Sequence, residues 1–155
     1  MTPPWFSPAV IERAVAIHRS HQTWTGRDLL PEAGAPPPDL AAALFQAPFV
    51  LIAHGTEADP VLNYGNRAAL DLWEMNWETL VQTPSRLTAE PMARDERARL
   101  LAEVTRNGFI AHYAGIRISS TGRRFRIAGA TVWNIQDASG HPAGQAAAFD
   151  RWEFL

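Results

Sequence analysis

The C-terminal part of the chain most constrains the fold, because it holds three long strand-like runs in succession. They are FIAHYAGIRISS, RRFRIAGATVWNIQD and PAGQAAAFDRWEF. The turns between them, STGR at 120–123 and DASGHP at 137–142, both carry glycine, as turns between antiparallel neighbours commonly do. The runs therefore predict a three-stranded meander, and other elements must cover at least one face of such a sheet.

Two shorter strands are expected earlier in the chain. Residues 49–53 lie in the apolar run FVLIAHG, and residues 61–64, with the sequence VLNY, follow the turn EADP. Together with the meander they predict a five-stranded antiparallel sheet. The fold class is therefore α+β.

Helices are expected before these strands and between them. An amphipathic helix should span residues 8–24, with Ser7 as its N-cap, and a short helix should span residues 39–46. Further short helices should follow Asn66, and a longer helix should span residues 94–107. The helices between the strands must fold over one face of the sheet, because the strands alone cannot bury their apolar side chains.

Length and composition suit one globular domain with an N-terminal extension. The chain has 155 residues, of which 46% are hydrophobic, and six Trp and seven Phe supply large core side chains. The segment LLPEAGAPPP is a connector because it is rich in Pro, Gly and Ala. We therefore divide the chain into residues 1–38, a helix with a Pro-rich connector, and residues 39–155, which form the sheet-bearing domain.

Charge and cysteine content exclude several classes of function. A net charge of -2 gives no basic field for nucleic acid. The absence of Cys excludes disulfides, Cys-based zinc sites and any chromophore bonded to a thiol. We find neither a signal peptide nor an apolar run of about 18 residues, so we expect a cytoplasmic chain without a membrane partner.

The order of these elements is that of the PAS fold, and the local sequence resembles one family. VLNYGNRAALDLWEMNWETLVQTPSRLTAEPMARDERARLLAEV, followed by GFIAHYAGIRISSTGRRFRIAGATVWNIQD, resembles the MEKHLA domain over roughly residues 40–152. The resemblance implies a PAS-like module of the stand-alone bacterial type. In plants the domain lies at the C-terminus of class III homeodomain–leucine-zipper transcription factors, where it is thought to sense a signal or regulate dimerisation. This sequence has neither a homeodomain helix nor a heptad zipper, so DNA binding is not implied.

A PAS-like fold leaves a cavity between the sheet and the helices, and eight large side chains are candidates to line it. Pockets for ligands are mostly apolar with a few polar groups, which this set suits. The alternative is that the same side chains fill a core without a usable pocket, because protein interiors are densely packed. The eight are Phe49, Trp73, Met75, Trp77, Phe109, Tyr113, Phe125 and Trp133.

Four polar side chains are candidates to contact a ligand: His54, Asn66, His112 and Arg117. Asn66 is also a natural N-cap for the helix that follows it. The two histidines are interpreted as ordinary polar side chains, because neither has a partner at the spacing of a metal or haem site. Arg117 belongs to a basic cluster around one hairpin, together with residues 123, 124 and 126. That cluster is either a site for an anionic ligand or acidic partner, or a solvated strand face.

The sequence carries no phosphate loop, dinucleotide fingerprint or nucleophile elbow, so we expect no catalytic residues. We also expect no metal site and no haem, and the cofactor and the small molecule are unknown. Two functions are left open: a sensory module with a ligand in its pocket, and a module that forms a homodimer through the N-terminal helix and its neighbours Trp5 and Phe6. An enzyme on the same scaffold is a third hypothesis.

Overall fold

Antiparallel pairing of six strands organises the molecule. The computed structural model describes residues 2–90 and 93–155. The sheet order is β2-β1-β5-β4-β3, which confirms the expected five-stranded antiparallel sheet, and a sixth strand pairs with β4. The strands are β1 (Val50–His54), β2 (Leu62–Gly65), β3 (Phe109–Ile118), β4 (Arg124–Gln136), β5 (Pro142–Phe149) and β6 (Arg151–Phe154).

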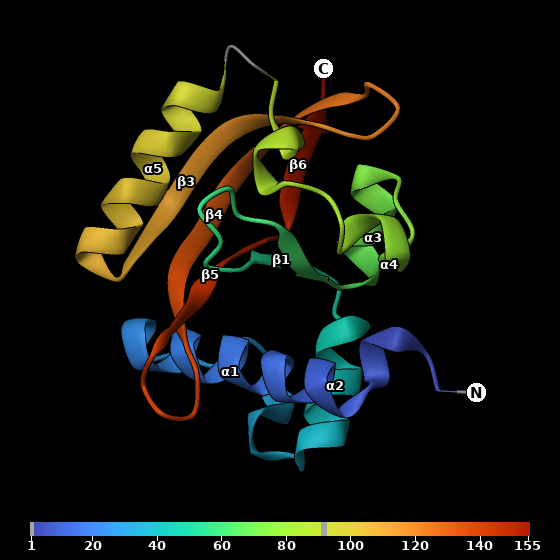
Figure 1. Cartoon of the computed structure of the whole chain (residues 1–155), viewed down its shortest axis with the longest axis vertical. Helices are drawn as coiled ribbons and strands as arrows, with labels where there is room; N and C mark the ends of the chain where they lie inside the picture. Colours follow the sequence, from blue (N-terminus) through green and yellow to red (C-terminus); the bar gives the residue numbers. More distant parts are fainter. Residues whose placement is uncertain (1, 91–92) are drawn as a thin grey trace.

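The last strand-like run of the sequence is divided in two. β5 pairs with the second half of β4, from Thr131 onward, and β6 pairs with the first half, from Phe125 to Ala128. Asp150 separates them, so β5 and β6 follow one another along the same edge of β4 (Figure 1).

The helices begin and end close to the expected residues. The Ser7 hydroxyl oxygen accepts a hydrogen bond from the Val10 amide at 3.4 Å, and Gly26 ends the first helix in the left-handed conformation. Among the described residues, no helix is both long enough and apolar enough to cross a membrane. The helices are α1 (Pro8–Thr25), α2 (Pro37–Phe45), α3 (Arg67–Trp73), α4 (Trp77–Leu80) and α5 (Arg94–Asn107), with 3-10 turns η1 (Pro4–Phe6), η2 (Pro31–Gly34) and η3 (Ser85–Thr88).

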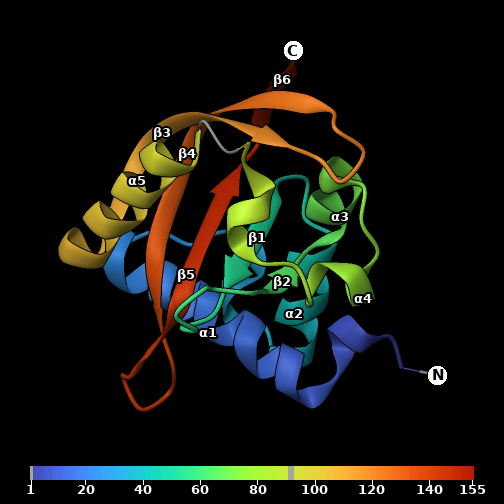
Figure 2. The same cartoon turned by 45° about the horizontal axis from the view of Figure 1, so that its top comes forward.

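Helices cover both faces of the sheet (Figures 1 and 2). On one face, Leu100 and Val104 of α5 are packed on Val132 of β4. On the other face lies α1, where the indole nitrogen of Trp133 donates to the Ile17 carbonyl at 3.1 Å. Residues of α1 and of the sheet share one hydrophobic core. The division of the chain at residue 38 stays a prediction.

A bulge in the β3–β4 pair decides which side chains face which helices. Gly129 has a φ of 65°, and the register of the pair shifts on both sides of Tyr113. Ile127 and Val132 line one cavity although they are an odd number of positions apart, whereas Trp133 contacts α1. Because strand side chains alternate between faces, an inserted residue inverts the pattern beyond it.

One buried amide joins three elements. The Asn66 Oδ1 atom accepts hydrogen bonds from the amides of Leu51 at 3.0 Å and Ala69 at 3.1 Å. Its Nδ2 atom donates to the carbonyls of Leu44 at 3.1 Å and Phe49 at 2.8 Å. Asn66 therefore caps α3 and also ties the end of α2 to the beginning of β1.

Replacing Asn66 should cost far more stability than replacing the other asparagine cap. Asn76 caps α4 through one exposed hydrogen bond, so Asn76→Ala should lower the free energy of unfolding by about 1 kcal/mol. Asn66→Ala also leaves buried backbone groups without partners, so the loss should be about 3–5 kcal/mol. Urea unfolding followed by tryptophan fluorescence measures both, and equal losses would contradict the joining role of Asn66.

Candidate functional site

A small cavity of about 60 Å³ lies between the sheet and the helical cover. Its walls come from all five strands β1 to β5 on one side and from α3, η3 and α5 on the other. Most of its lining is apolar, and the polar side chains come from six different elements. The lining residues with polar groups are His54, Trp73, Ser85, Thr88, Arg97, Tyr113, Arg117 and Gln145.

Four of the residues predicted from the sequence meet at this cavity. They are Trp73, Tyr113, His54 and Arg117. Trp73 reaches it from the end of α3, where its ring also contacts Phe125 edge to face. The other three come from strands of the sheet.

The remaining predicted residues lie elsewhere. Phe125 and Trp133 are fully buried in the core, and Asn66 is a structural cap. Phe49, Phe109 and His112 line a separate open depression near the C-terminal end of α1. Met75 and Trp77 lie beside Trp5, outside the cavity. The β-bulge explains part of this, since it turns Trp133 and its cross-strand neighbour Phe109 towards α1.

Four polar lining residues were missed: Ser85, Thr88, Arg97 and Gln145. Arg97 carried a usable signal, because it lies three positions before Leu100 and seven before Val104, on the buried stripe of α5. Ser85 and Thr88 lie in the 3-10 turn η3, which had no sequence pattern of its own. Gln145 lies within a run of small residues in β5, and nothing in that run marked it.

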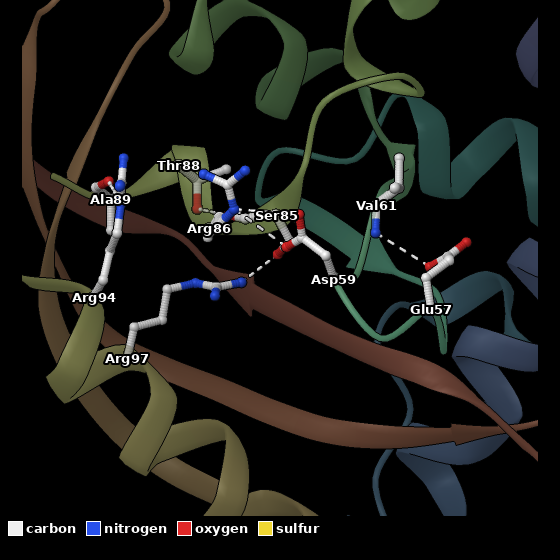
Figure 3. A network of polar contacts seen from close by, with 9 residues as sticks. All are labelled: Glu57, Asp59, Val61, Ser85, Arg86, Thr88, Ala89, Arg94 and Arg97. Carbon is white, nitrogen blue, oxygen red and sulfur yellow. Dashed lines mark hydrogen bonds and ion pairs between the residues drawn. The ribbon is translucent and has the colours of Figure 1, made fainter. Parts of the chain in front are cut away.

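Arg97 reaches from α5 towards η3 (Figure 3). Its guanidinium donates a hydrogen bond to the Ser85 hydroxyl. Burial, and next the charge of Arg117, lower the pKa of Arg97 to about 10. The same turn holds Arg86, which differs because it pairs with Asp59 at 3.2 Å on the exposed surface. Arg97 has no such acidic partner among the described residues.

Arg117 lies on β3 and is only 7% exposed. One of its terminal nitrogens donates to the Ile116 carbonyl at 2.8 Å, and the other donates to the Tyr113 hydroxyl at 3.3 Å. The guanidinium carbon lies 5.5 Å from the centre of the Tyr113 ring. These contacts orient the group, but none of them neutralises its charge.

His54 lies at the end of β1 with its ring against the cavity. Its Nδ1 atom is 3.0 Å from the Gly55 carbonyl, so Nδ1 carries a proton and donates it. Its Nε2 atom is buried and has no partner in hydrogen-bond geometry, although the Gln145 side chain lies beside the ring. Burial lowers the pKa of His54, although the Gly55 contact opposes this, so the neutral ring presents an unused acceptor. The indole nitrogen of Trp73 is a second buried polar atom without a partner.

The family comparison covers nearly the whole chain. The model of the MEKHLA domain matches residues 11–154. Homeobox-leucine zipper protein ATHB-8 of Arabidopsis thaliana is 26% identical over 157 residues, which cover 100% of this chain and 18% of that protein. ATHB-9 of the same plant is 29% identical over 100 residues, 64% of this chain and 12% of that protein. The chain therefore spans less than a fifth of either relative, and these plant proteins give no support to the predicted stand-alone bacterial type.

Solved structures confirm the PAS-like fold. The PAS domain of a Colwellia psychrerythraea protein has a TM-score of 0.60 at 12% identity, covering 76% of this chain and 94% of that chain. A light-oxygen-voltage domain has a TM-score of 0.58 at 13% identity, covering 76% and 84%. The PAS domain of a LuxR-family transcriptional regulator from Burkholderia thailandensis, solved in complex with ethanol, has a TM-score of 0.54 at 18% identity, covering 74% and 95%. At such low identities the likeness concerns the fold alone.

The buried histidine should make stability depend on pH. Because burial lowers the pKa of His54 below the value of about 6.5 of an unfolded chain, the unfolded state binds more protons as pH falls. The free energy of unfolding should therefore decrease from pH 7 to pH 5. This decrease should be smaller for His54→Asn than for the unchanged chain. Urea unfolding at both pH values tests this.

His112→Asn is the matched control for that measurement, because His112 is exposed and its positive φ of 62° suits Asn. It should show the full decrease. An equally steep decrease in His54→Asn would show that His54 is not a source of the pH dependence.

Proposed function

The chain belongs to the MEKHLA domain family, and from this premise we propose that it is a non-catalytic sensory or regulatory module that binds a small molecule in its cavity. The observation that carries the proposal is the cavity lining. It is largely apolar, it lies between the sheet and the helices of a PAS-like fold, and it contains buried polar atoms without partners. Such a lining is typical of a site for a small molecule.

Size restricts the ligand. A water molecule needs roughly 10–15 Å³ of cavity volume, so about 60 Å³ holds about four to six water-sized groups. A molecule of a few non-hydrogen atoms fits without movement of the walls. The PAS domain from Burkholderia thailandensis, which was solved with ethanol, supports a ligand of this size on the same fold.

The polar groups do not form a familiar catalytic arrangement. The Ser85 hydroxyl is paired with Arg97, and His54 directs its proton to the Gly55 carbonyl. A serine nucleophile would instead need a base within hydrogen-bond reach. PAS-like sensory domains are generally non-catalytic, which agrees with this arrangement. A cytoplasmic location, as expected from the sequence, remains part of the proposal.

Filling the cavity should abolish ligand binding. Ala147 lines the cavity, whereas its neighbour Ala148 lines the depression on the opposite face, and both are half-buried. Native mass spectrometry of freshly purified protein should detect a bound small molecule in the unchanged chain and in Ala148→Leu. That mass should be missing from Ala147→Leu. Retention of the mass in Ala147→Leu, or no bound mass in any of the three proteins, would contradict the proposal.

A homodimer through the N-terminal helix is the second candidate function. α1 buries only part of its apolar side chains within the chain, and Ile11 and Val15 are half-buried along an open groove that Ile135 also lines. Exposed Glu12 and Arg19 lie beside the groove and give it charges of both signs. A surface of that kind can pair with a second copy of itself.

Val15→Arg tests the homodimer. Light scattering after size exclusion should give twice the chain mass of 17.1 kDa for the unchanged protein and the single mass for Val15→Arg. Ala98→Arg, on the exposed side of α5, should stay dimeric. The measurement is made at about 100 µM, which is about the dissociation constant of a weak homodimer. A monomeric mass for the unchanged chain at this concentration would exclude the interface as a stable contact.

A further inference from the structure

The cavity contains two positive charges and no negative one. Arg97 and Arg117 both line it, whereas no Asp or Glu does so among the described residues. Two like charges held close together without a counter-ion are unfavourable, and burial increases the cost. Burial, and after it the charge of Arg117, lower the pKa of Arg97.

Two arginines on the surface of the chain show the pairing that the cavity arginines lack. Arg86 lies 3.2 Å from Asp59, and Arg124 pairs with Glu90. The chain also contains more acidic than basic residues, sixteen Asp and Glu against fourteen Lys and Arg. A lack of carboxylates therefore does not explain why the two arginines of the cavity are unpaired. An acid from outside the chain could supply the missing negative charge.

We propose that the cavity binds a small monocarboxylate whose charged end lies between Arg97 and Arg117. This inference rests on the small-molecule function proposed above and names the class of ligand. A guanidinium can hold a carboxylate through two parallel hydrogen bonds, and both groups keep N–H donors that no described protein atom accepts. The two guanidinium groups supply the positive charge that balances the negative charge of the carboxylate. The Ser85 and Tyr113 hydroxyls accept hydrogen bonds from these groups and hold them in place.

The rest of the lining favours a carboxylate over an inorganic anion. Ile52, Leu62, Ile127, Val132 and Phe149 cover the cavity with hydrocarbon. Phosphate presents acceptors in every direction, and those that face hydrocarbon would lose their hydrogen bonds to water. A short monocarboxylate has one charged end for the arginines and one apolar end for this wall. The volume of the cavity suits a ligand of about four to six non-hydrogen atoms.

Calorimetric titration of the full chain with sodium propionate tests the proposal. Propionamide, which has the same shape without the charge, and sodium phosphate serve as comparison ligands, all in the same concentration of sodium chloride. Propionate should bind saturably and raise the melting temperature, because a ligand of the folded state stabilises it by mass action. Propionamide and phosphate should bind at least tenfold more weakly.

Arg97→Gln is the decisive variant, with Arg99→Gln as its matched control. Both arginines lie on α5, but Arg99 is exposed and does not line the cavity. Loss of one charged hydrogen-bond donor should weaken propionate binding by about 10-fold to 100-fold in Arg97→Gln, while Arg99→Gln should bind as the unchanged chain does. Arg97→Gln should keep its melting temperature without ligand, since it removes a charge that has no counter-ion.

The outcomes separate this inference from the function on which it rests. If propionamide binds as tightly as propionate, or if Arg97→Gln leaves propionate binding unchanged, the carboxylate is wrong while the small-molecule site stands. Tighter binding of phosphate would replace the carboxylate with an inorganic anion. A neutral bound mass that Ala147→Leu removes, without any binding of propionate, would also overturn the carboxylate alone. If no probe binds and no bound mass is found, both proposals fail.

Discussion

The four hydrogen bonds of Asn66 fix the position of the elements on which the site depends. Asn66 joins the end of α2, the beginning of β1 and the first turn of α3 through a side chain that is fully buried. β1 then delivers His54 to the cavity, and α3 delivers Trp73. The wall of the cavity therefore depends on a residue that does not touch it. Such positioning needs all donors and acceptors of a buried amide to be paired, because an unpaired one would cost more than the cap contributes.

Most of the fold could be predicted because its signals are local. Ser7, Asn66 and Gly26 mark helix ends by their own chemistry, and the glycine-containing turns mark the meander. The face of the sheet to which each strand side chain points could not be predicted from local sequence in the same way. The bulge at Gly129 inverts the alternation of β4, so Trp133 lies under α1 and not against the cavity. A glycine in a strand indicates that a bulge can form, but it does not say which residues the partner strand skips.

The candidate site was predicted only in part, for a related reason. Trp73, Tyr113, His54 and Arg117 were named, but as members of a larger aromatic set from which the sequence could not select. Arg97 was missed because an arginine on a helix usually extends into water and covers apolar surface with its stem. Its position on the stripe of Leu100 and Val104 was the available sign. A charged residue on the buried face of an amphipathic helix is thus as informative as an aromatic residue on a sheet.

The attachment of α5 has a consequence for how the interior exchanges with solvent. Only Leu100 and Val104 of this helix are buried, and they form a small apolar cluster with Val132, separate from the main core. A segment held by so little apolar surface opens at a lower free energy than the strands beneath it. Partial detachment of this helix would open the cavity to solvent while the sheet stays folded. Amide hydrogen exchange would register such an opening as low protection confined to residues 94–107.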